Sequence, residues 1–174
     1  MSNLTREEQK LLAEVQKLVM DDDQLVNYET LKINAPEEAS GEFWFRIAEA
    51  MSTLPPNRSL DLRVRGGRLV EAVSILSVLI QDNDRIPELW AQKITALNYL
   101  AHGHFIRANG LSQQPDKADQ AQEEAYLSKA MSQNLLTTLE SAIERFPEEQ
   151  WFREMQADAW THFGKDARQP EAQA

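Results

Sequence analysis

Residues 68–100 contain two apolar runs with helical period, separated by a polar break. In the first run, apolar side chains recur at steps of three or four residues and therefore share one helix face. These residues are Leu69, Val73, Leu76, Leu79 and Ile80. Polar residues 81–84 and Pro87 end this run, because proline lacks the N–H that a continuing helix needs, and a second run opens at Trp90. The pattern predicts an antiparallel helical hairpin.

Further helices are predicted before this hairpin. Thr5 followed by Glu8 is a capping box, which predicts a helix through about Met20. Residues 24–35 fit either a short helix or a strand, and the helix is favoured. Pro36 suits the first turn of a helix that would run to about Leu54 with Gly41 inside it.

Residues 60–65 allow two interpretations. The segment LDLRVR alternates strictly, and Gly66 and Gly67 follow it, which is typical of a strand and a turn. Alternatively, Ser59 caps one long helix through Gln81 with a kink or break at the glycines. A lone strand would have little to pair with, so the helix is favoured.

The last third of the chain is expected to be helical after a loop. The pattern weakens beyond Leu100, and residues 110–115 are expected to form that loop. A long helix is predicted over residues 116–145, and a last one from about residue 148 to Gly164. We therefore predict an all-α fold, with one helical-repeat domain over residues 1–164 and a disordered tail over residues 165–174.

Composition narrows the class of protein. The chain has no cysteine, which removes disulfides and thiolate chemistry. Its longest uncharged apolar run, residues 72–80, is far shorter than a membrane span, so we expect a soluble, cytoplasmic protein. The net charge of −10 makes nucleic acid an improbable partner, because binding it depends on neutralising phosphates.

Three tryptophans open the second arm of successive candidate hairpins, and an alanine follows each one six residues later. The pairs are Trp44 and Ala50, Trp90 and Ala96, and Trp151 and Ala157. This pattern resembles the tetratricopeptide repeat, in which an early aromatic precedes a small residue at the helix crossing. The tryptophan spacings of 46 and 61 residues depart from the regular repeat of that family. The resemblance implies a right-handed superhelix of about six to seven stacked helices.

One basic run is the candidate partner-binding site, formed by Arg58, Arg63, Arg65 and Arg68. Guanidinium groups hold carboxylates in two-point contacts, so the run could line a groove for an acidic segment of another protein. The alternative, which we favour, is that these arginines pair with acidic helices of the same molecule.

Little in the sequence suggests catalysis. His102 and His104 flank Gly103 without a nearby acid, which favours exposed imidazoles at a helix end over a metal site. The aspartates at 21–23 lack the spacing of a calcium loop, and no known catalytic or phosphate-binding motif occurs. We expect no catalytic residues, no metal and no cofactor.

These observations favour a non-enzymatic module for protein–protein interaction, since stacked helical hairpins suit peptides or partner helices. An adaptor or chaperone-like role, for example in a bacterial secretion or assembly system, is the first hypothesis. The alternatives are a structural subunit of an oligomeric complex and an enzyme with an unrecognised site.

Overall fold

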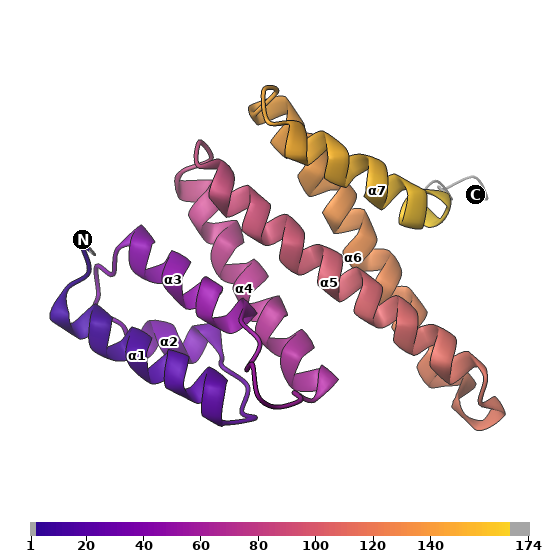
Figure 1. Cartoon of the computed structure of the whole chain (residues 1–174), viewed down its shortest axis with the longest axis horizontal. Helices are drawn as coiled ribbons and strands as arrows, with labels where there is room; N and C mark the ends of the chain where they lie inside the picture. Colours follow the sequence, from indigo (N-terminus) through magenta and orange to yellow (C-terminus); the bar gives the residue numbers. More distant parts are fainter. Residues whose placement is uncertain (1–2, 168–174) are drawn as a thin grey trace. The chain divides into compact units, whose positions relative to one another are not determined.

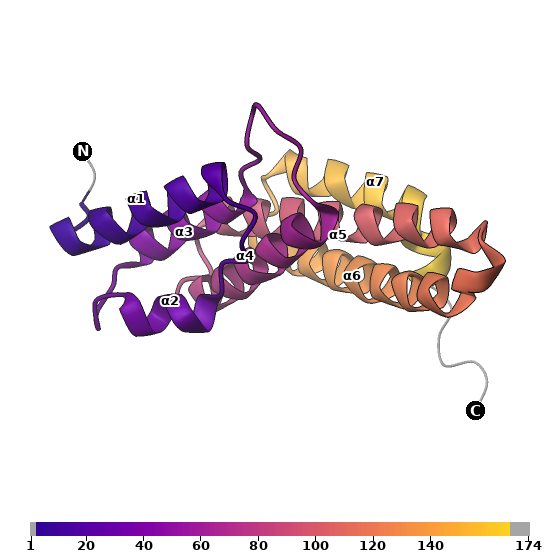
Figure 2. The same ribbon diagram turned by 90° about the horizontal axis from the view of Figure 1, so that it is seen from below.

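The structure is a computed structural model that describes residues 3–167, and it is all-helical, as the sequence predicts (Figures 1 and 2). The α-helices are α1 (Arg6–Asp21), α2 (Tyr28–Asn34), α3 (Gly41–Ser52), α4 (Leu62–Asp82), α5 (Pro87–Ser112), α6 (Ala118–Arg145) and α7 (Gln150–Ala167). A 3-10 helix, η1 (Pro115–Lys117), precedes α6. No strand occurs in the described range, so the helical interpretation of residues 24–35 and 60–65 is confirmed.

The chain forms two compact units, residues 1–96 and 97–174, with the boundary inside α5. In the first unit, α3 packs against both α1 and α4, and α2 also contacts α4. In the second unit, α6 packs against α7. The single domain over residues 1–164 and the tetratricopeptide-like superhelix stay predictions.

The first turn of α1 is held by the predicted capping box. The Thr5 hydroxyl accepts a hydrogen bond from the backbone N–H of Glu8 at 3.2 Å, and the Glu8 carboxylate accepts one from the N–H of Thr5 at 2.8 Å. The same carboxylate also accepts a 2.7 Å hydrogen bond from the N–H of Ser40, the residue that caps α3. Glu8 is only 2% exposed, and it therefore ties the starts of α1 and α3 together.

The predicted start of α3 at Pro36 is wrong. The helix begins at Gly41, because the Ser40 hydroxyl accepts a hydrogen bond from the N–H of Phe43 and so satisfies a donor that the first turn leaves open. Gly41 is consequently the first residue of α3 rather than a flaw inside it.

Helix α4 runs without a break through both glycines. Its cap is Asp61, whose carboxylate accepts from the N–H of Arg63, and not Ser59 as predicted. Gly67 has a packing role, since a Cβ at this position would lie 2.4 Å from a methyl carbon of Leu25. A glycine here lets the chain segment after α1 approach α4.

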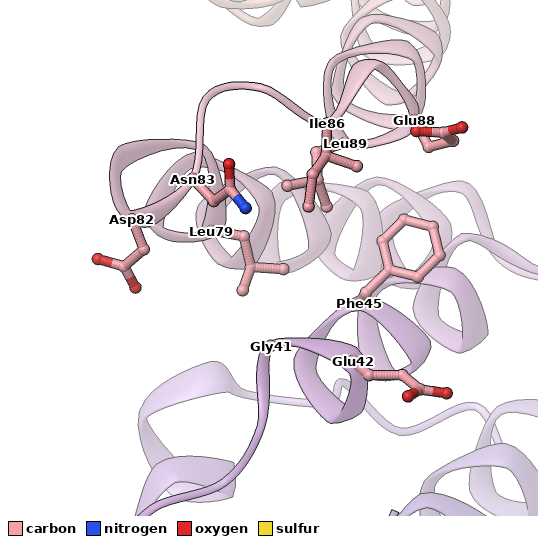
Figure 3. Close-up of a pocket in the computed structure, with 9 residues that line it drawn as sticks. All are labelled: Gly41, Glu42, Phe45, Leu79, Asp82, Asn83, Ile86, Glu88 and Leu89. Carbon is pink, nitrogen blue, oxygen red and sulfur yellow. The ribbon is translucent and has the colours of Figure 1, made fainter. Parts of the chain in front are cut away.

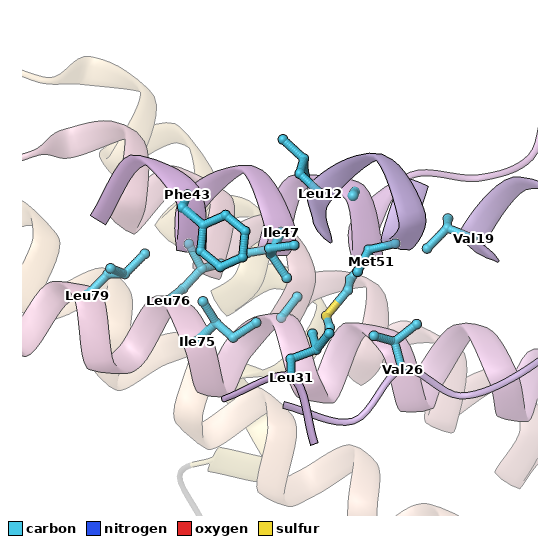
Figure 4. Close-up of a cluster of buried hydrophobic side chains, with 14 of the residues drawn as sticks. Leu12, Val19, Val26, Leu31, Phe43, Ile47, Met51, Ile75, Leu76 and Leu79 are labelled. Atoms are coloured by element: carbon cyan, nitrogen blue, oxygen red, sulfur yellow. The ribbon is translucent and has the colours of Figure 1, made fainter. Parts of the chain in front are cut away.

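The core of the first unit lies where α1, α2, α3 and α4 meet (Figure 4). Phe43, Ile47 and Met51 of α3 face Ile75 and Leu76 of α4, and each of the five is at most 1% exposed. Ile75 is buried as well, although it is not one of the five residues that form the predicted apolar face of α4.

Two helices, α5 and α7, end later than the sequence predicted. Helix α5 does not stop near Leu100 but continues to Ser112, so the predicted loop shrinks to the residues just before η1. The Ser128 hydroxyl of α6 donates to the carbonyl of Ala101 in α5 at 3.0 Å, which joins the two helices through small side chains. Helix α7 passes Gly164 and ends at Ala167; the rest of the predicted disordered tail lies outside the described residues.

The repeated tryptophan–alanine pairs have different surroundings. Ala50 and Ala96 are buried, as expected for residues at a helix crossing, whereas Ala157 is exposed. Trp151 is also more exposed than the other two tryptophans of the pattern. The third pair therefore lacks the burial that the pattern predicts.

Replacing Gly103 by alanine is expected to stabilise the protein. Gly103 lies inside α5, and a Cβ there would meet nothing within 4 Å, so Gly103→Ala gains helix propensity without a clash. We expect the free energy of unfolding to rise by about 0.5–1 kcal/mol in chemical denaturation. Gly67→Ala is the matched comparison, and it should gain less because Leu25 must move. A destabilised Gly103→Ala variant would contradict this account of α5.

The hydrogen bonds to Glu8 predict a pH dependence of stability. Burial raises the pKa of the Glu8 carboxyl, but hydrogen bonds from Ser40 and Thr5 lower it more, so this pKa lies below its ordinary value of 4.5. The stability that the ionised carboxylate contributes is therefore complete above the ordinary pKa and is lost as the pH falls through the folded pKa. Unfolding free energies of the wild type and Glu8→Gln should converge in this acidic range. Glu7→Gln, at an exposed neighbour, should show no such convergence.

Candidate functional site

The four arginines of the candidate partner-binding run have different surroundings. Arg68 is 1% exposed, and its guanidinium donates four hydrogen bonds to backbone carbonyls at the end of α1 and just after it. The acceptors are the carbonyls of Val19 at 3.0 Å, Asp22 at 2.7 Å, and Gln24 at 2.8 and 3.2 Å. A partner has no access to this side chain in the structure.

Arg58 binds the same helix end from the loop between α3 and α4. It donates to the carbonyls of Met20 at 2.9 Å and Asp22 at 2.7 Å, and it pairs with the carboxylate of Asp23. Arg58 thus forms an ion pair within the molecule, as we favoured for these arginines, whereas Arg68 binds backbone carbonyls rather than acidic side chains. Arg63 is exposed and Arg65 is half-buried, and partner binding by these two stays a prediction.

Electrostatics explain why two arginines meet at the end of α1. The C-terminus of a helix carries a partial negative charge, and α1 ends in aspartates without a basic residue in its last turn. Burial lowers the pKa of Arg68, as does the positive charge of Arg58, whereas Asp23 and Asp22 raise it. A guanidinium stays protonated in proteins, so the buried charge is balanced by carbonyl oxygens.

The two predicted exposed histidines at a helix end lie instead within α5, and that prediction is wrong. The His102 ring packs against His162 and Phe163 of α7, with ring centroids 5.2 and 4.8 Å apart. Burial lowers the pKa of His102, and the charge of His162 lowers it further. Among the described residues no third potential metal ligand joins these two imidazoles.

A second polar cluster joins α5 to α6. Nδ1 of His104 lies 2.6 Å from a carboxylate oxygen of Glu124, and the guanidinium of Arg107 lies 3.2 Å from the same oxygen. The side chains of His104 and Glu124 are 12% and 19% exposed. The acid partner was missed because it lies 20 residues further along the chain. We interpret this cluster as an anchor between helices.

The first unit has an apolar pocket that sequence reasoning missed (Figure 3). Its volume is about 520 Å³, and it lies where the start of α3, the end of α4 and the start of α5 come together. The lining residues are Gly41, Glu42, Phe45, Leu79, Asp82, Asn83, Ile86, Glu88 and Leu89. We call this feature the α3–α5 pocket.

The walls of the α3–α5 pocket are apolar, and its edges are charged. Figure 3 shows Phe45, Leu79 and Ile86 pointing toward a common gap, with Leu89 beside Ile86. Leu79 and Leu89 are 9% and 4% exposed and form the floor, whereas Ile86 is 39% exposed at the edge. Ile86, a large apolar residue in an otherwise polar turn, is the sequence feature that could have indicated this pocket.

The described residues contain no group of three or more potential metal ligands, and no helix among them is long and apolar enough to cross a membrane. No protein-family model, curated protein or solved structure matches the chain. The α3–α5 pocket therefore has to be interpreted from its own geometry.

Removing the Arg68 guanidinium is expected to destabilise the first unit. Arg68→Met keeps most of the side-chain volume but leaves carbonyls such as that of Val19 without their donor. We expect a loss of about 3 kcal/mol in the free energy of unfolding, measured by chemical denaturation. Arg68→Lys should recover part of this loss, because an ammonium keeps the charge but lacks the planar fork.

Arg63→Met is the matched control for this prediction, since Arg63 is an exposed arginine in the same helix. It should change the unfolding free energy by no more than about 0.5 kcal/mol. Equal effects of Arg68→Met and Arg63→Met would show that the buried guanidinium has no special role.

Proposed function

We propose that the protein is a non-enzymatic protein-binding module whose α3–α5 pocket takes up an apolar side chain of a partner protein. The observation that carries this proposal is the apolar pocket itself, with buried Leu79 and Leu89 as its floor and half-buried Phe45 in its wall. Water in contact with these side chains is displaced when an apolar group enters, which is the main favourable term in most protein associations.

Binding is supported over catalysis by the kinds of groups that line the pocket. The lining has carboxylates and one amide but no histidine, serine, lysine or tyrosine that could pair with them as nucleophile or base. The carboxylates stand at the edges of the pocket, where a ligand would leave them in contact with water.

A side chain of a larger partner is favoured over a small-molecule ligand. Small-molecule sites usually enclose most of the ligand surface. The α3–α5 pocket instead opens to solvent, and Ile86 extends the apolar surface to its edge. An anchor side chain with flanking residues across the edge makes fuller use of such a surface.

The size of the pocket limits the affinity expected for a partner side chain. Burying one large apolar side chain contributes about 1.5–3 kcal/mol. A short peptide is therefore expected to bind weakly, with a dissociation constant on the order of 10 mM. A whole partner would add contacts outside the pocket.

The test is the titration of a short synthetic peptide, one leucine flanked by glutamines, into the full chain while amide chemical shifts are recorded. The largest changes should occur in residues 41–45 and 79–89. Gly41→Leu should abolish them by filling the pocket, since a Cβ at Gly41 would sit 3.9 Å from Leu79, an ordinary contact. Ile86→Ser should weaken binding about five-fold or more through lost apolar contact.

Two matched controls separate the pocket from general effects. Gly110→Leu places a leucine at another helical glycine with open space, and Val70→Ser removes an apolar side chain that is 40% exposed, close to the value for Ile86. Both variants should bind the peptide like the wild type. No peptide binding, or equal loss in the controls, would refute the proposed function, and binding of only small apolar molecules would replace it.

A further inference from the structure

We infer that the segment bound by the α3–α5 pocket is basic, with lysine or arginine flanking its apolar anchor. This inference rests on the proposed function and adds the charge of the partner to it. The evidence is the arrangement of three carboxylates at the pocket edges, on Glu42, Asp82 and Glu88.

The carboxylates lie on opposite sides of the apolar gap. In Figure 3, Glu42 and Glu88 lie near one end, beside Phe45, and Asp82 lies with Asn83 near the other. Glu42 is half-buried, and Asp82 and Glu88 are exposed. A segment that placed an apolar residue in the gap would therefore have carboxylates near its residues on both sides.

None of these three carboxylates forms an ion pair with a cation of the described residues. The nearest basic residues in the sequence do not line the pocket. Arg46 pairs with Glu49 at 3.1 Å, and Arg85 lies exposed in the turn before α5. The edges thus remain available to cations of another molecule.

The helix dipole explains the positions of two of these acids but not of the third. Glu42 and Glu88 lie in the first turns of α3 and α5, where the positive end of the helix dipole stabilises a carboxylate. Asp82 is the last residue of α4, where the dipole is negative and disfavours an acid. At the similarly acidic end of α1, Arg58 and Arg68 supply positive charge from within the molecule. Among the described residues Asp82 has no such partner, and a cation on the bound segment would supply it.

The experiment compares three peptides with the same leucine anchor and different flanks. One carries arginine, one glutamine and one glutamate on both sides. At low salt we expect the arginine peptide to bind roughly ten-fold tighter than the glutamine peptide, and the glutamate peptide to bind weakest. At about 1 M salt, where the screening length is about 3 Å, the three affinities should converge.

A variant with uncharged pocket edges tests whether the three carboxylates cause the preference for the arginine peptide. Glu42→Gln, Asp82→Asn and Glu88→Gln are combined, and the arginine peptide should then bind no more tightly than the glutamine peptide. The glutamine peptide itself should bind as before. The matched control is Glu7→Gln with Asp119→Asn and Asp21→Asn, which neutralises two first-turn acids and one last-turn acid on other helices. This control should keep the preference for arginine.

The outcomes separate the two proposals. Equal affinities of the three peptides, all lost in Gly41→Leu, would overturn the basic partner and leave the apolar site standing. A preference for arginine that survives in the neutral-edge variant, or one lost equally in the matched control, would also overturn the inference. Failure of every peptide to bind would refute the proposed function and the inference with it.

Discussion

The first unit depends on one buried charge, the guanidinium of Arg68. A cation without water around it is costly unless hydrogen bonds replace the hydration. Here the carbonyls of Val19, Asp22 and Gln24 replace it, and they belong to the end of α1 and the segment that follows. Those carbonyls have no partner within a helix that has already ended, so donor and acceptors satisfy each other. Three aspartates can stand at the end of α1 and just after it because Arg68 of α4 and Arg58 of the preceding loop supply positive charge.

The N-terminal end of α1 is held by a negative charge, the carboxylate of Glu8. The buried Glu8 carboxylate binds the N–H groups of Thr5 and Ser40, at the starts of α1 and α3. One helix is therefore fixed to α3 by an acid and to α4 by an arginine, with the apolar core between them. This arrangement has a consequence for the α3–α5 pocket, because Ser40 caps the turn that carries Gly41 and Glu42 to the pocket edge. The buried polar contacts of α1 thus help to define a surface to which α1 itself contributes no residue.

Some features that depend on neighbouring residues were predicted, although the caps of α3 and α4 were not, and features that depend on distant residues were missed. The capping box of α1 was correct because Thr5 and Glu8 are three residues apart. The continuation of α5 was missed because α6 stabilises it from a distance along the chain: Ser128 binds the carbonyl of Ala101, and Glu124 binds His104. Arg68 was grouped with Arg58, Arg63 and Arg65 in one basic run, although it lies four and seven residues before the buried Ala72 and Ile75 and so shares their helix face. The α3–α5 pocket could not be predicted, because three helix ends have to meet before it exists.

The ends of three helices also determine the electric field of this pocket. The starts of α3 and α5 each contribute about half a positive charge, and the end of α4 contributes about half a negative one. These partial charges leave a small positive sum, which by itself would favour an anion. Glu42, Asp82 and Glu88 add three full negative charges and reverse that preference. Glu42 and Glu88 each lie at a helix start, where the partial positive charge favours an acid, whereas Asp82 lies at the one helix end that needs no acid. The pocket therefore combines an apolar floor with a negative edge that the stability of its own helices does not require.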